Sequence, residues 1–406
     1  MTQVCRHCAA PLETRFLDLG FAPPSNAYLT SDDLKKPEVT FPLRLLACGN
    51  CRLVQTEDFA AADALFTDDY AYFSSTSQGW LDHAQRYVDM VSKRLGLGPQ
   101  SHVMEIASND GYLLKNFVAK GIPCVGVEPT ESTAAAARGQ GIPVIQDFFG
   151  MNLVKRLEQA DLIIGNNVYA HVPEINDFTA ALKAVLKPQG VITLEFPHLM
   201  RLVELRQFDT VYHEHFSYLS LLVVERIFKA AGLRIFDAEE LPTHGGSLRI
   251  YGCHEAATHL QLNSVATLLD QERARGMDRD AFYLAFQSQA DEVKNGFLEF
   301  LLHAKAEGKS VAGYGAAAKG NTIINYAGVR PDLLPFICDA ASAKIGKLMP
   351  GSHIPILAPA ALRENRPDYL IILPWNIATE VKAQCSDLAA LGTRFVTAVP
   401  RLEVSQ

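Results

Sequence analysis

The sequence has 406 residues and no apolar run that approaches the roughly 18 residues of a membrane-spanning helix. It also has no run of basic residues, and its formal net charge of −8 gives no basis for binding nucleic acid. The first residues, MTQVCRHCAA, lack the apolar core of a signal peptide. These absences predict a cytoplasmic protein with neither a nucleic-acid nor a membrane partner.

Low-complexity segments and convincing internal repeats are absent as well. Hydrophobic residues make up 48% of the chain and charged residues 20%, a balance typical of a globular protein. A chain of this length is too long for one ordinary core, so we expect two or three domains.

The eight cysteines are spread unevenly, because four of them form two C-x-x-C pairs. Two such pairs can present four thiolates tetrahedrally to Zn²⁺, and disulfides, the alternative, are disfavoured in a cytosolic setting. With all four ligand positions filled, the metal would be structural and would stabilise a turn-rich zinc-binding domain over residues 1–70. The predicted zinc ligands are Cys5, Cys8, Cys48 and Cys51.

Predicted strands and helices alternate along residues 71–256. An amphipathic helix over 80–97 comes first, and two strands, at 233–241 and 246–255, come last with no long helix between them. The pattern predicts an α/β domain with a mostly parallel, Rossmann-like sheet and an antiparallel final strand. A helical stretch and a further strand, glycine turn and helix over 310–328 predict a second Rossmann-like α/β domain over 257–406.

The order of these elements resembles the class I S-adenosylmethionine-dependent methyltransferase fold. The turn after its first strand usually reads E-x-G-x-G-x-G; here Glu105 and Gly111 are kept, while Ala107 and Asn109 occupy two glycine positions. A dinucleotide-binding G-x-G-x-x-G pattern is absent. Asn tolerates left-handed backbone, so a tight turn is still expected. An ordinary strand–turn–helix is the alternative for this motif alone.

Polar residues also follow the next strands. Glu128 ends the second strand, where an acid can accept the ribose hydroxyls of a nucleoside. Ligands of open α/β sheets bind outside the carboxyl ends of the strands, with adenine expected after the third strand and the methionine part after the fourth. The resemblance implies that S-adenosylmethionine contacts Glu105, Ala107, Asn109, Gly111, Glu128, Pro129, Asp147, Phe148, Asn166 and Asn167.

The stretch TVYHEHFSYLS, residues 210–220, gathers two His, one Glu and two Tyr between the fifth strand and the following helix. It therefore belongs to the carboxyl edge of the sheet. His171, after the fourth strand, and His244, before the last strand, are expected on the same side. For His213 alone a structural role is preferred, and a second zinc site is disfavoured because further ligands with clear spacing are absent.

Many segments together resemble the nucleotide-sugar C-methyltransferases that build branched deoxysugars. That family acts on a thymidine-diphosphate-linked 4-keto-deoxysugar and methylates carbon 3 through an enolate. The matching segments span nearly the whole chain in the family's order: CRHC…CGNCRLVQ, DYAYFSSTS, EIASNDGYLL, NNVYAHVP, YHEHFSYLS, HGGSLR, GYGAAAKGNTIINYAG, PGSHIPI and LPWN.

The resemblance implies catalytic roles without a catalytic metal. His215 would be the base that removes the carbon-3 proton, and Glu214 would orient it or contact the sugar. The carbonyl and ring hydroxyls would be surrounded by Tyr212, His171 and Tyr72, with Tyr70 as the competing assignment for the last.

The resemblance also implies that residues 257–406 bind the nucleotide of the sugar. A phosphate could bind where the helix after the glycine turn starts; the spacing is not that of a Walker A loop, and a cofactor-binding Rossmann turn is the alternative. The segment CDAASAKIGK is less basic than the family pattern, which leaves the nucleotide and the sugar open. The predicted substrate-binding residues are His244, Gly245, Ser247, Arg249, Lys319, Asn321 and Lys344.

Two other functions are compatible with parts of the sequence. One is O- or N-methylation, which would not need acidification of a carbon, and the other is non-catalytic binding of a nucleotide sugar. The proton-transferring stretch argues against the first, and Glu128 together with the intact YHEH run argues against the second. The expected state is a monomer.

Overall fold

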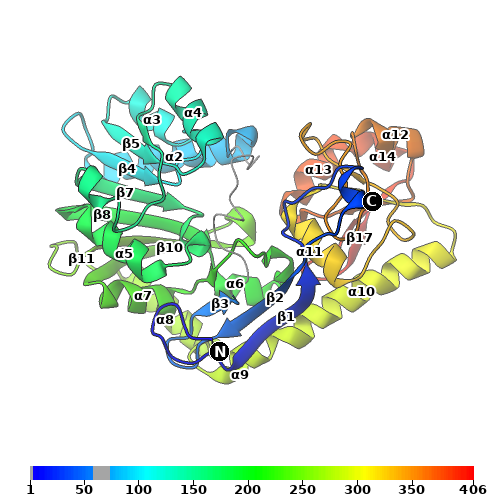
Figure 1. The fold of residues 1–406 in the computed structure, drawn as a ribbon, viewed down its shortest axis with the longest axis horizontal. Coiled ribbons are helices and arrows are strands. Elements are labelled where there is room, and N and C mark those ends of the chain that lie inside the picture. The colour runs from blue at the N-terminus through cyan, green and yellow to red at the C-terminus, as the bar shows by residue number, and fades with distance from the viewer. Residues whose placement is uncertain (1–2, 58–73) are drawn as a thin grey trace.

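The computed structural model describes residues 3–57 and 74–406, so Tyr70 and Tyr72 lie outside the described residues. A small N-terminal sheet lies at the base of the molecule, and two α/β lobes rise from it (Figure 1). Within the described part of the chain, no helix combines the length and the apolar character needed to cross a membrane.

The N-terminal sheet is completed by a segment from the central part of the chain. Its first three strands are antiparallel: β1 (Thr14–Ala22), β2 (Phe41–Ala47) and β3 (Val54–Thr56). The fourth, β9 (Ser217–Tyr218), pairs with β3, so that Val54 lies opposite Tyr218. The predicted proton-transferring stretch therefore ends inside the N-terminal sheet, and the two are positioned together.

The four paired cysteines come together beside this sheet. Their sulfur atoms all lie within 4.8 Å of one another. The Cys5–Cys51 and Cys8–Cys48 sulfurs are each 3.5 Å apart, far beyond the roughly 2.05 Å of a disulfide. Hydrogen bonds to sulfur from the Cys51 N–H and from Gln55 orient two of the ligands. The cluster fits a closed structural zinc site, because its four thiolates could fill all four positions of a tetrahedron.

The central lobe contains a seven-stranded sheet in the order β10-β11-β8-β7-β4-β5-β6. All neighbouring strands are parallel except β11, which is antiparallel to both β8 and β10, so the predicted antiparallel final strand is confirmed. The strands are β4 (Val103–Ile106), β5 (Cys124–Val127), β6 (Val144–Ile145), β7 (Ala160–Asn166), β8 (Leu186–Pro197), β10 (Leu233–Leu241) and β11 (Ser247–His254).

Helices cover both faces of the central sheet, because alternate apolar side chains of its strands point to opposite sides. Leu162 and Ile164 of β7 pack with one group of helices, whereas Ile163 packs with the other. On the first face lie α2 (Gln78–Leu95), α3 (Leu114–Ala119) and α4 (Glu131–Gly139); on the second lie α5 (Ile175–Ala184), α7 (Leu221–Ala230) and α8 (Asn263–Ala274). Helix α8 thus packs on the central lobe, although it follows residue 256.

The connection between β8 and α7 is more structured than the sequence suggested. It contains helix α6 (Leu199–Glu204) and a 3-10 turn at Phe208–Thr210 before the YHEH stretch. The segment KPQG, which contains helix-ending Pro and Gly residues, lies near the start of the long strand β8. Pairing of Leu186 with Ala160 of β7 stabilises the extended form there.

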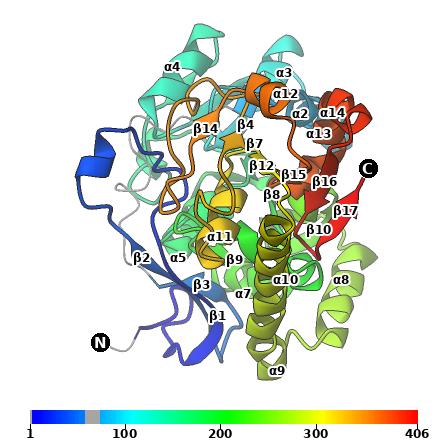
Figure 2. The same cartoon turned by 90° about the vertical axis from the view of Figure 1, so that its right-hand side faces the viewer.

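The C-terminal lobe has a six-stranded sheet in the order β14-β13-β12-β15-β16-β17, parallel except for the last strand. The long helix α10 (Phe286–Ala306) joins it to the N-terminal sheet (Figure 2). Phe286 stacks on Phe16 of β1 with ring centroids 4.9 Å apart. The remaining elements are β12 (Val311–Tyr314), α11 (Ala318–Tyr326), β13 (Ile337–Cys338), β14 (Ile356–Leu357), α12 (Ala360–Asn365), β15 (Tyr369–Ile372), α13 (Ala378–Gln384), α14 (Ser386–Ala390), β16 (Arg394–Thr397) and β17 (Glu403–Ser405).

The cysteine cluster generates a prediction about metal content and stability. We expect one zinc ion per chain, and we expect Cys8→Ser to lose most of it and to unfold at lower temperature. Structural zinc contributes roughly 10–16 kcal/mol in zinc-finger peptides, so losing a ligand should destabilise the N-terminal sheet. Elemental analysis and thermal unfolding measure both effects. Cys253→Ser, at a lone buried cysteine of β11, should keep the zinc. Folded wild-type protein with less than about half an equivalent of zinc would contradict the site.

Candidate active site

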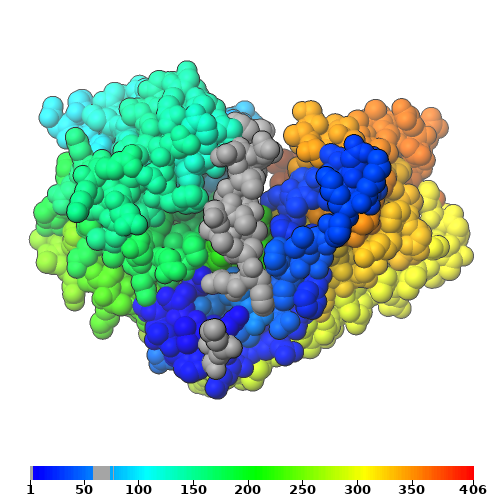
Figure 3. All heavy atoms as spheres, in the orientation of Figure 1, coloured from blue at the N-terminus to red at the C-terminus, as the bar shows by residue number. Residues whose placement is uncertain are grey.

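A cavity of about 870 Å³ lies between the two lobes. In the space-filling view of Figure 3, the central lobe and the C-terminal lobe lie on opposite sides of the molecule. The wall of the cavity on the central lobe consists of the carboxyl ends of β4, β5, β7 and β8, where ligands of open α/β sheets bind. The C-terminal lobe contributes the start of α11 and the loop after β15, and the N-terminal segment contributes Asn26.

The turn after β4 is built from alternating left-handed residues. Ala107, Asn109 and Gly111 have φ of 55°, 50° and 79°, which is the region that glycine adopts most easily. Only at Gly111 is space decisive as well, because an added Cβ would lie 2.3 Å from Ile142 Cδ1. The absence of two expected glycines therefore leaves the shape of the turn intact.

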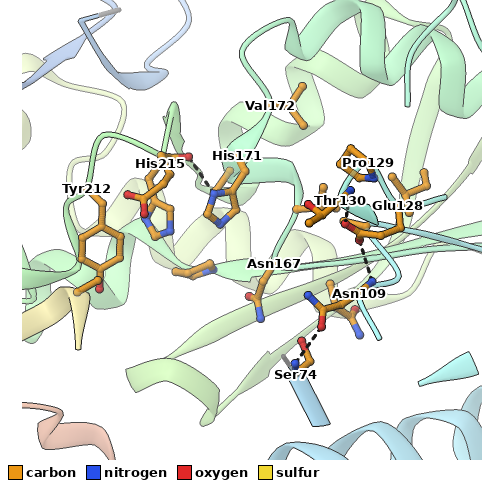
Figure 4. Close-up of a pocket in the computed structure, with 18 of the residues that line it drawn as sticks. Ser74, Asn109, Glu128, Pro129, Thr130, Asn167, His171, Val172, Tyr212 and His215 are labelled. Atoms are coloured by element: carbon orange, nitrogen blue, oxygen red, sulfur yellow. Dashed lines mark hydrogen bonds between the residues drawn. The ribbon is translucent and has the colours of Figure 1, made fainter. Parts of the chain in front are cut away.

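Glu128 connects this turn to the end of β5 (Figure 4). Its Oε2 accepts the N–H of Asn109 at 2.9 Å, and its Oε1 accepts the N–H of Thr130 at 3.0 Å. A carboxylate has about four lone-pair sites, so two remain for the hydroxyls of a ribose. At the end of β7, the side-chain oxygens of Asn166 and Asn167 are buried without a hydrogen-bond donor among the described residues. These acceptors fit the ammonium group of a methionine.

The cavity gathers most of the predicted cofactor residues. Glu105, inside β4, and Gly111, in the turn, do not line the cavity. Burial raises the pKa of the Glu105 carboxyl well above its usual range. Asp147 lies at the rim, where it forms an ion pair with Arg156 at 2.6 Å. The residues that line the cavity are Ala107, Asn109, Glu128, Pro129, Asp147, Phe148, Asn166 and Asn167.

Two histidines that line the cavity face each other. The rings of His171 and His215 are edge to face, with centroids 4.5 Å apart. His215 Nδ1–H donates to the carbonyl of Thr210 at 3.1 Å, and His171 Nδ1–H donates to the carbonyl of Glu214 at 2.9 Å. These bonds define the tautomer and leave Nε2 as the acceptor in each ring.

Burial keeps both rings neutral. It lowers the pKa of His171 to about 4, and it lowers that of His215 well below 6.5, with a further contribution from neighbouring His171. The His215 ring also lies 4.7 Å from that of Tyr212. At neutral pH, therefore, His215 presents an unprotonated nitrogen to the cavity.

Glu214 is buried, and burial raises the pKa of its carboxyl. Its Oε1 accepts the side-chain amide of Asn26 at 2.9 Å, while Oε2 has no hydrogen-bond donor among the described residues. The carboxylate does not hold His215, whose Nδ1 is bonded to Thr210 instead. His213 lies outside the cavity and hydrogen-bonds the carbonyl of Phe41 in β2, which suits a structural role.

Of the predicted substrate-binding residues, His244, Lys319 and Lys344 line the cavity, and Gly245, Ser247, Arg249 and Asn321 do not. Arg249 is held within the sheet and does not face the cavity. In β11 it lies opposite Glu195 of β8 and Glu239 of β10, and it forms ion pairs with both, at 2.7 and 2.9 Å. Its charge is thus neutralised within the sheet.

The other three predicted substrate-binding residues that do not line the cavity make contacts within the protein. Asn321 Oδ1 accepts the side-chain amide of Asn325 within α11, and Ser247 Oγ donates to the carbonyl of Thr243. Gly245 lies against the ring of Trp375.

Several cavity residues had no signal in the sequence. Asn26 comes from the segment between β1 and β2, and Trp80 comes from the first turn of α2, where its ring packs 5.1 Å from that of His244. Without a partner visible in sequence, each reads as an ordinary turn or core residue. The further unpredicted wall residues include Tyr112 and Asn376.

Glu128 generates a prediction about cofactor affinity. Glu128→Gln should weaken S-adenosylmethionine binding, because it removes a charged acceptor and leaves one of two backbone N–H groups facing an amide. Losing a hydrogen bond to a charged group costs roughly 1.5–3 kcal/mol. Calorimetric titration measures the loss, and Glu131→Gln, at an exposed position in the first turn of α4, should bind as the wild type does. Unchanged affinity in the Glu128 variant would contradict the assignment.

Three family models match consecutive parts of the chain. They describe a zinc-binding domain over residues 5–66, a methyltransferase domain over 80–238 and a C-methyltransferase C-terminal domain over 242–400. The whole chain is similar to the C-methyltransferase NovU of Streptomyces niveus. The two share 32% identity over 404 residues, which cover 98% of this chain and 96% of the relative.

Solved structures resemble parts of the chain more distantly. The PH0226 protein of Pyrococcus horikoshii shares 18% identity at a TM-score of 0.39, over 47% of this chain and 99% of that one. The magnesium protoporphyrin IX methyltransferase of Synechocystis, solved with bound S-adenosylmethionine, shares 15% identity at a TM-score of 0.34, over 43% and 81%. The assignment therefore rests on the full-length relative and the three family models. The chain belongs to the family of S-adenosylmethionine-dependent C-methyltransferases with an N-terminal zinc-binding domain.

Proposed function

We propose that the protein methylates carbon 3 of a nucleotide-linked 4-keto-deoxysugar, with thymidine diphosphate as the nucleotide, through an enolate. The observation that carries the proposal is the setting of His215. Its ring is neutral, its tautomer is defined by Thr210, and it faces the cavity beside the predicted cofactor-binding edge. Forming a carbon–carbon bond next to a ketone requires a base for a C–H proton, whereas methylating a hydroxyl does not require acidification of carbon.

In the proposed reaction, His215 Nε2 accepts the proton from carbon 3. Bound S-adenosylmethionine supplies the methyl group as part of a sulfonium ion. The residues at the ends of β4, β5 and β7 position this donor, so two reactants are held in one cavity. Such positioning is worth roughly 7–11 kcal/mol when the reacting atoms are well aligned.

Glu214 is proposed to bind a hydroxyl of the sugar. Of its two suggested roles, contact with the sugar fits better than orientation of the base, because Thr210 already occupies the second nitrogen of His215. Asn26 holds one carboxyl oxygen, and the other is buried without a donor. A sugar hydroxyl would supply the missing hydrogen bond, since a buried polar atom without a partner costs about 1–3 kcal/mol.

The nucleotide is proposed to bind on the C-terminal side of the cavity. Lys344 and the N-terminal turn of α11 line that wall. Backbone N–H groups at a helix start and an ammonium group together suit a phosphate.

His215 generates the prediction that tests this function. In deuterated water with S-adenosylhomocysteine bound, the wild type should exchange the carbon-3 hydrogen of a thymidine-diphosphate-linked 4-keto-deoxysugar. His215→Asn should slow both exchange and methylation by a factor of roughly 10²–10⁴, the usual contribution of a general base. Mass spectrometry follows both reactions.

The matched control is His213→Asn, a change two residues away at a histidine outside the cavity, which should retain exchange. If exchange persists at the wild-type rate in His215→Asn, the base lies elsewhere, and His171 is the next residue to substitute.

The neutral histidines also predict the pH dependence of catalysis. A lowered pKa keeps an imidazole unprotonated as the pH falls, so the base form of His215 should persist through pH 6.5, the ordinary pKa of histidine. The acid limb of kcat/KM should therefore lie below pH 6.5. Steady-state rates between about pH 4.5 and 8 measure it, because kcat/KM reports the free enzyme. An acid limb at or above pH 6.5 would show that the base is not desolvated as the structure indicates.

A further inference from the structure

Lys319 belongs to the C-terminal lobe, and the helix that carries it is hydrogen-bonded to the central lobe. It occupies the first turn of α11 and lines the cavity wall. One turn later, Thr322 Oγ1 donates to the carbonyl of Val211 at 2.9 Å, which ties the helix to the segment that carries His215. The helix start and the base are therefore held in a common frame.

The ammonium group of Lys319 has no direct partner of opposite charge. Among the described residues it forms no ion pair within 4.0 Å, and the carboxylate whose charge acts on it is that of Asp209. That carboxylate accepts the indole N–H of Trp375 at 2.7 Å, and Lys319 Nζ lies 5.8 Å from the centre of the indole ring. Burial lowers the pKa of Lys319, whereas Asp209 opposes this and favours the charged form.

The second lysine of the cavity differs, because its ammonium group is held at the C-terminal wall, where the nucleotide is proposed to bind. Lys344 Nζ donates to the carbonyl of Ala316 at 2.9 Å and lies 3.5 Å from Asp339. Lys319 forms no such ion pair among the described residues. Its charge contributes to the lowered pKa of both His215 and His244, so the ammonium group lies within electrostatic reach of the proposed base.

With a weak base of this kind, the negative charge that develops on the carbonyl oxygen of the substrate needs a hydrogen-bond donor. An imidazole whose pKa is lowered by burial is a weaker proton acceptor than free histidine, so proton transfer from carbon is harder. A donor aimed at the forming enolate oxygen compensates most effectively inside a buried cavity. Carbon 3, which loses the proton, is bonded directly to carbon 4, which carries the carbonyl oxygen. The donor to that oxygen must therefore lie close to the base.

We propose that Lys319 is a catalytic residue, whose ammonium group donates a hydrogen bond to the carbonyl oxygen at carbon 4 as the enolate forms. The inference rests on the proposed function and assigns that oxygen its partner. The C–H bond at carbon 3 breaks, and the proton goes to His215 Nε2. The electron pair forms the double bond between carbons 3 and 4, and the carbonyl pair moves to oxygen, while Lys319 keeps its protons. Carbon 3 then forms its bond to the methyl group as the sulfur–methyl bond breaks with its pair on sulfur, and the carbonyl is restored.

The alternative is that Lys319 binds a phosphate of the nucleotide, and the two roles affect different measurements. We expect Lys319→Met to slow carbon-3 deuterium exchange and kcat by a factor of about 10²–10³, the usual effect of losing one oxyanion donor. Its affinity for thymidine diphosphate, measured by calorimetry, should change by less than about threefold. Lys344→Met is the contrasting variant. We expect its affinity for thymidine diphosphate to fall by a factor of about ten or more, because phosphate contacts are charge-assisted.

Thermal unfolding shows whether each variant is folded. Because Lys319→Met leaves Asp209 without its countercharge, the double variant with Asp209→Asn provides a folded reference if the single variant is unstable. Slow exchange with intact nucleotide binding in either variant supports the proposal. Weakened nucleotide binding with normal exchange at saturation overturns it and assigns Lys319 to phosphate. If the wild type neither exchanges nor methylates 4-keto sugars, the proposed function fails and the inference fails with it.

Discussion

The segment from Phe208 to Tyr218 is held by contacts from the N-terminal sheet, the central lobe and the C-terminal lobe, and the geometry of the site depends on this restraint. Its end pairs with β3 of the N-terminal sheet. Its middle accepts hydrogen bonds from Thr322 of α11 and from His171 of the central lobe. Each bond contributes only about 1 kcal/mol net, but the restraints come from different domains and act together. With the domains packed as they are in the structure, these contacts position the base without a ligand.

The cysteine cluster contributes to the position of the same segment. It anchors the start of a sheet whose last strand, β9, begins two residues after His215. The segment between β1 and β2 then extends to both lobes, with Asn26 bonded to Glu214 and Tyr28 bonded to the carbonyl of Ala316 at 2.6 Å. Backbone pairing between β3 and β9 therefore connects the cysteine cluster to the segment that carries His215, although the cysteines do not line the cavity.

Burial dominates the electrostatics of the cavity. It lowers the pKa of His171 and His244 to about 4 and raises that of Asp209 to about 6. Charges beside the buried base are therefore weakly screened, and an ammonium group has a larger effect there than it would in water. Much of the fold could be predicted, as could the meeting of the four cysteines and the placement of His171, His215 and His244 in one cavity. Arg249 was expected to contact the substrate, but it does not line the cavity, because Glu195 and Glu239, which form ion pairs with it, adjoin it only after the strands pair.

The sequence by itself determined the order of the strands and helices, the four zinc ligands and the edge of the sheet where the YHEH stretch lies. These follow from periodicity, from C-x-x-C spacing and from the rule that carboxyl ends of parallel strands share one edge. Only the tertiary structure decided which polar groups meet. Asn26 and Glu214 are 188 residues apart, and Asp209 and Trp375 are 166 apart. Such contacts leave no local pattern, because they depend on how separately folded surfaces pack, and they decide which groups are neutralised and which remain available to a ligand.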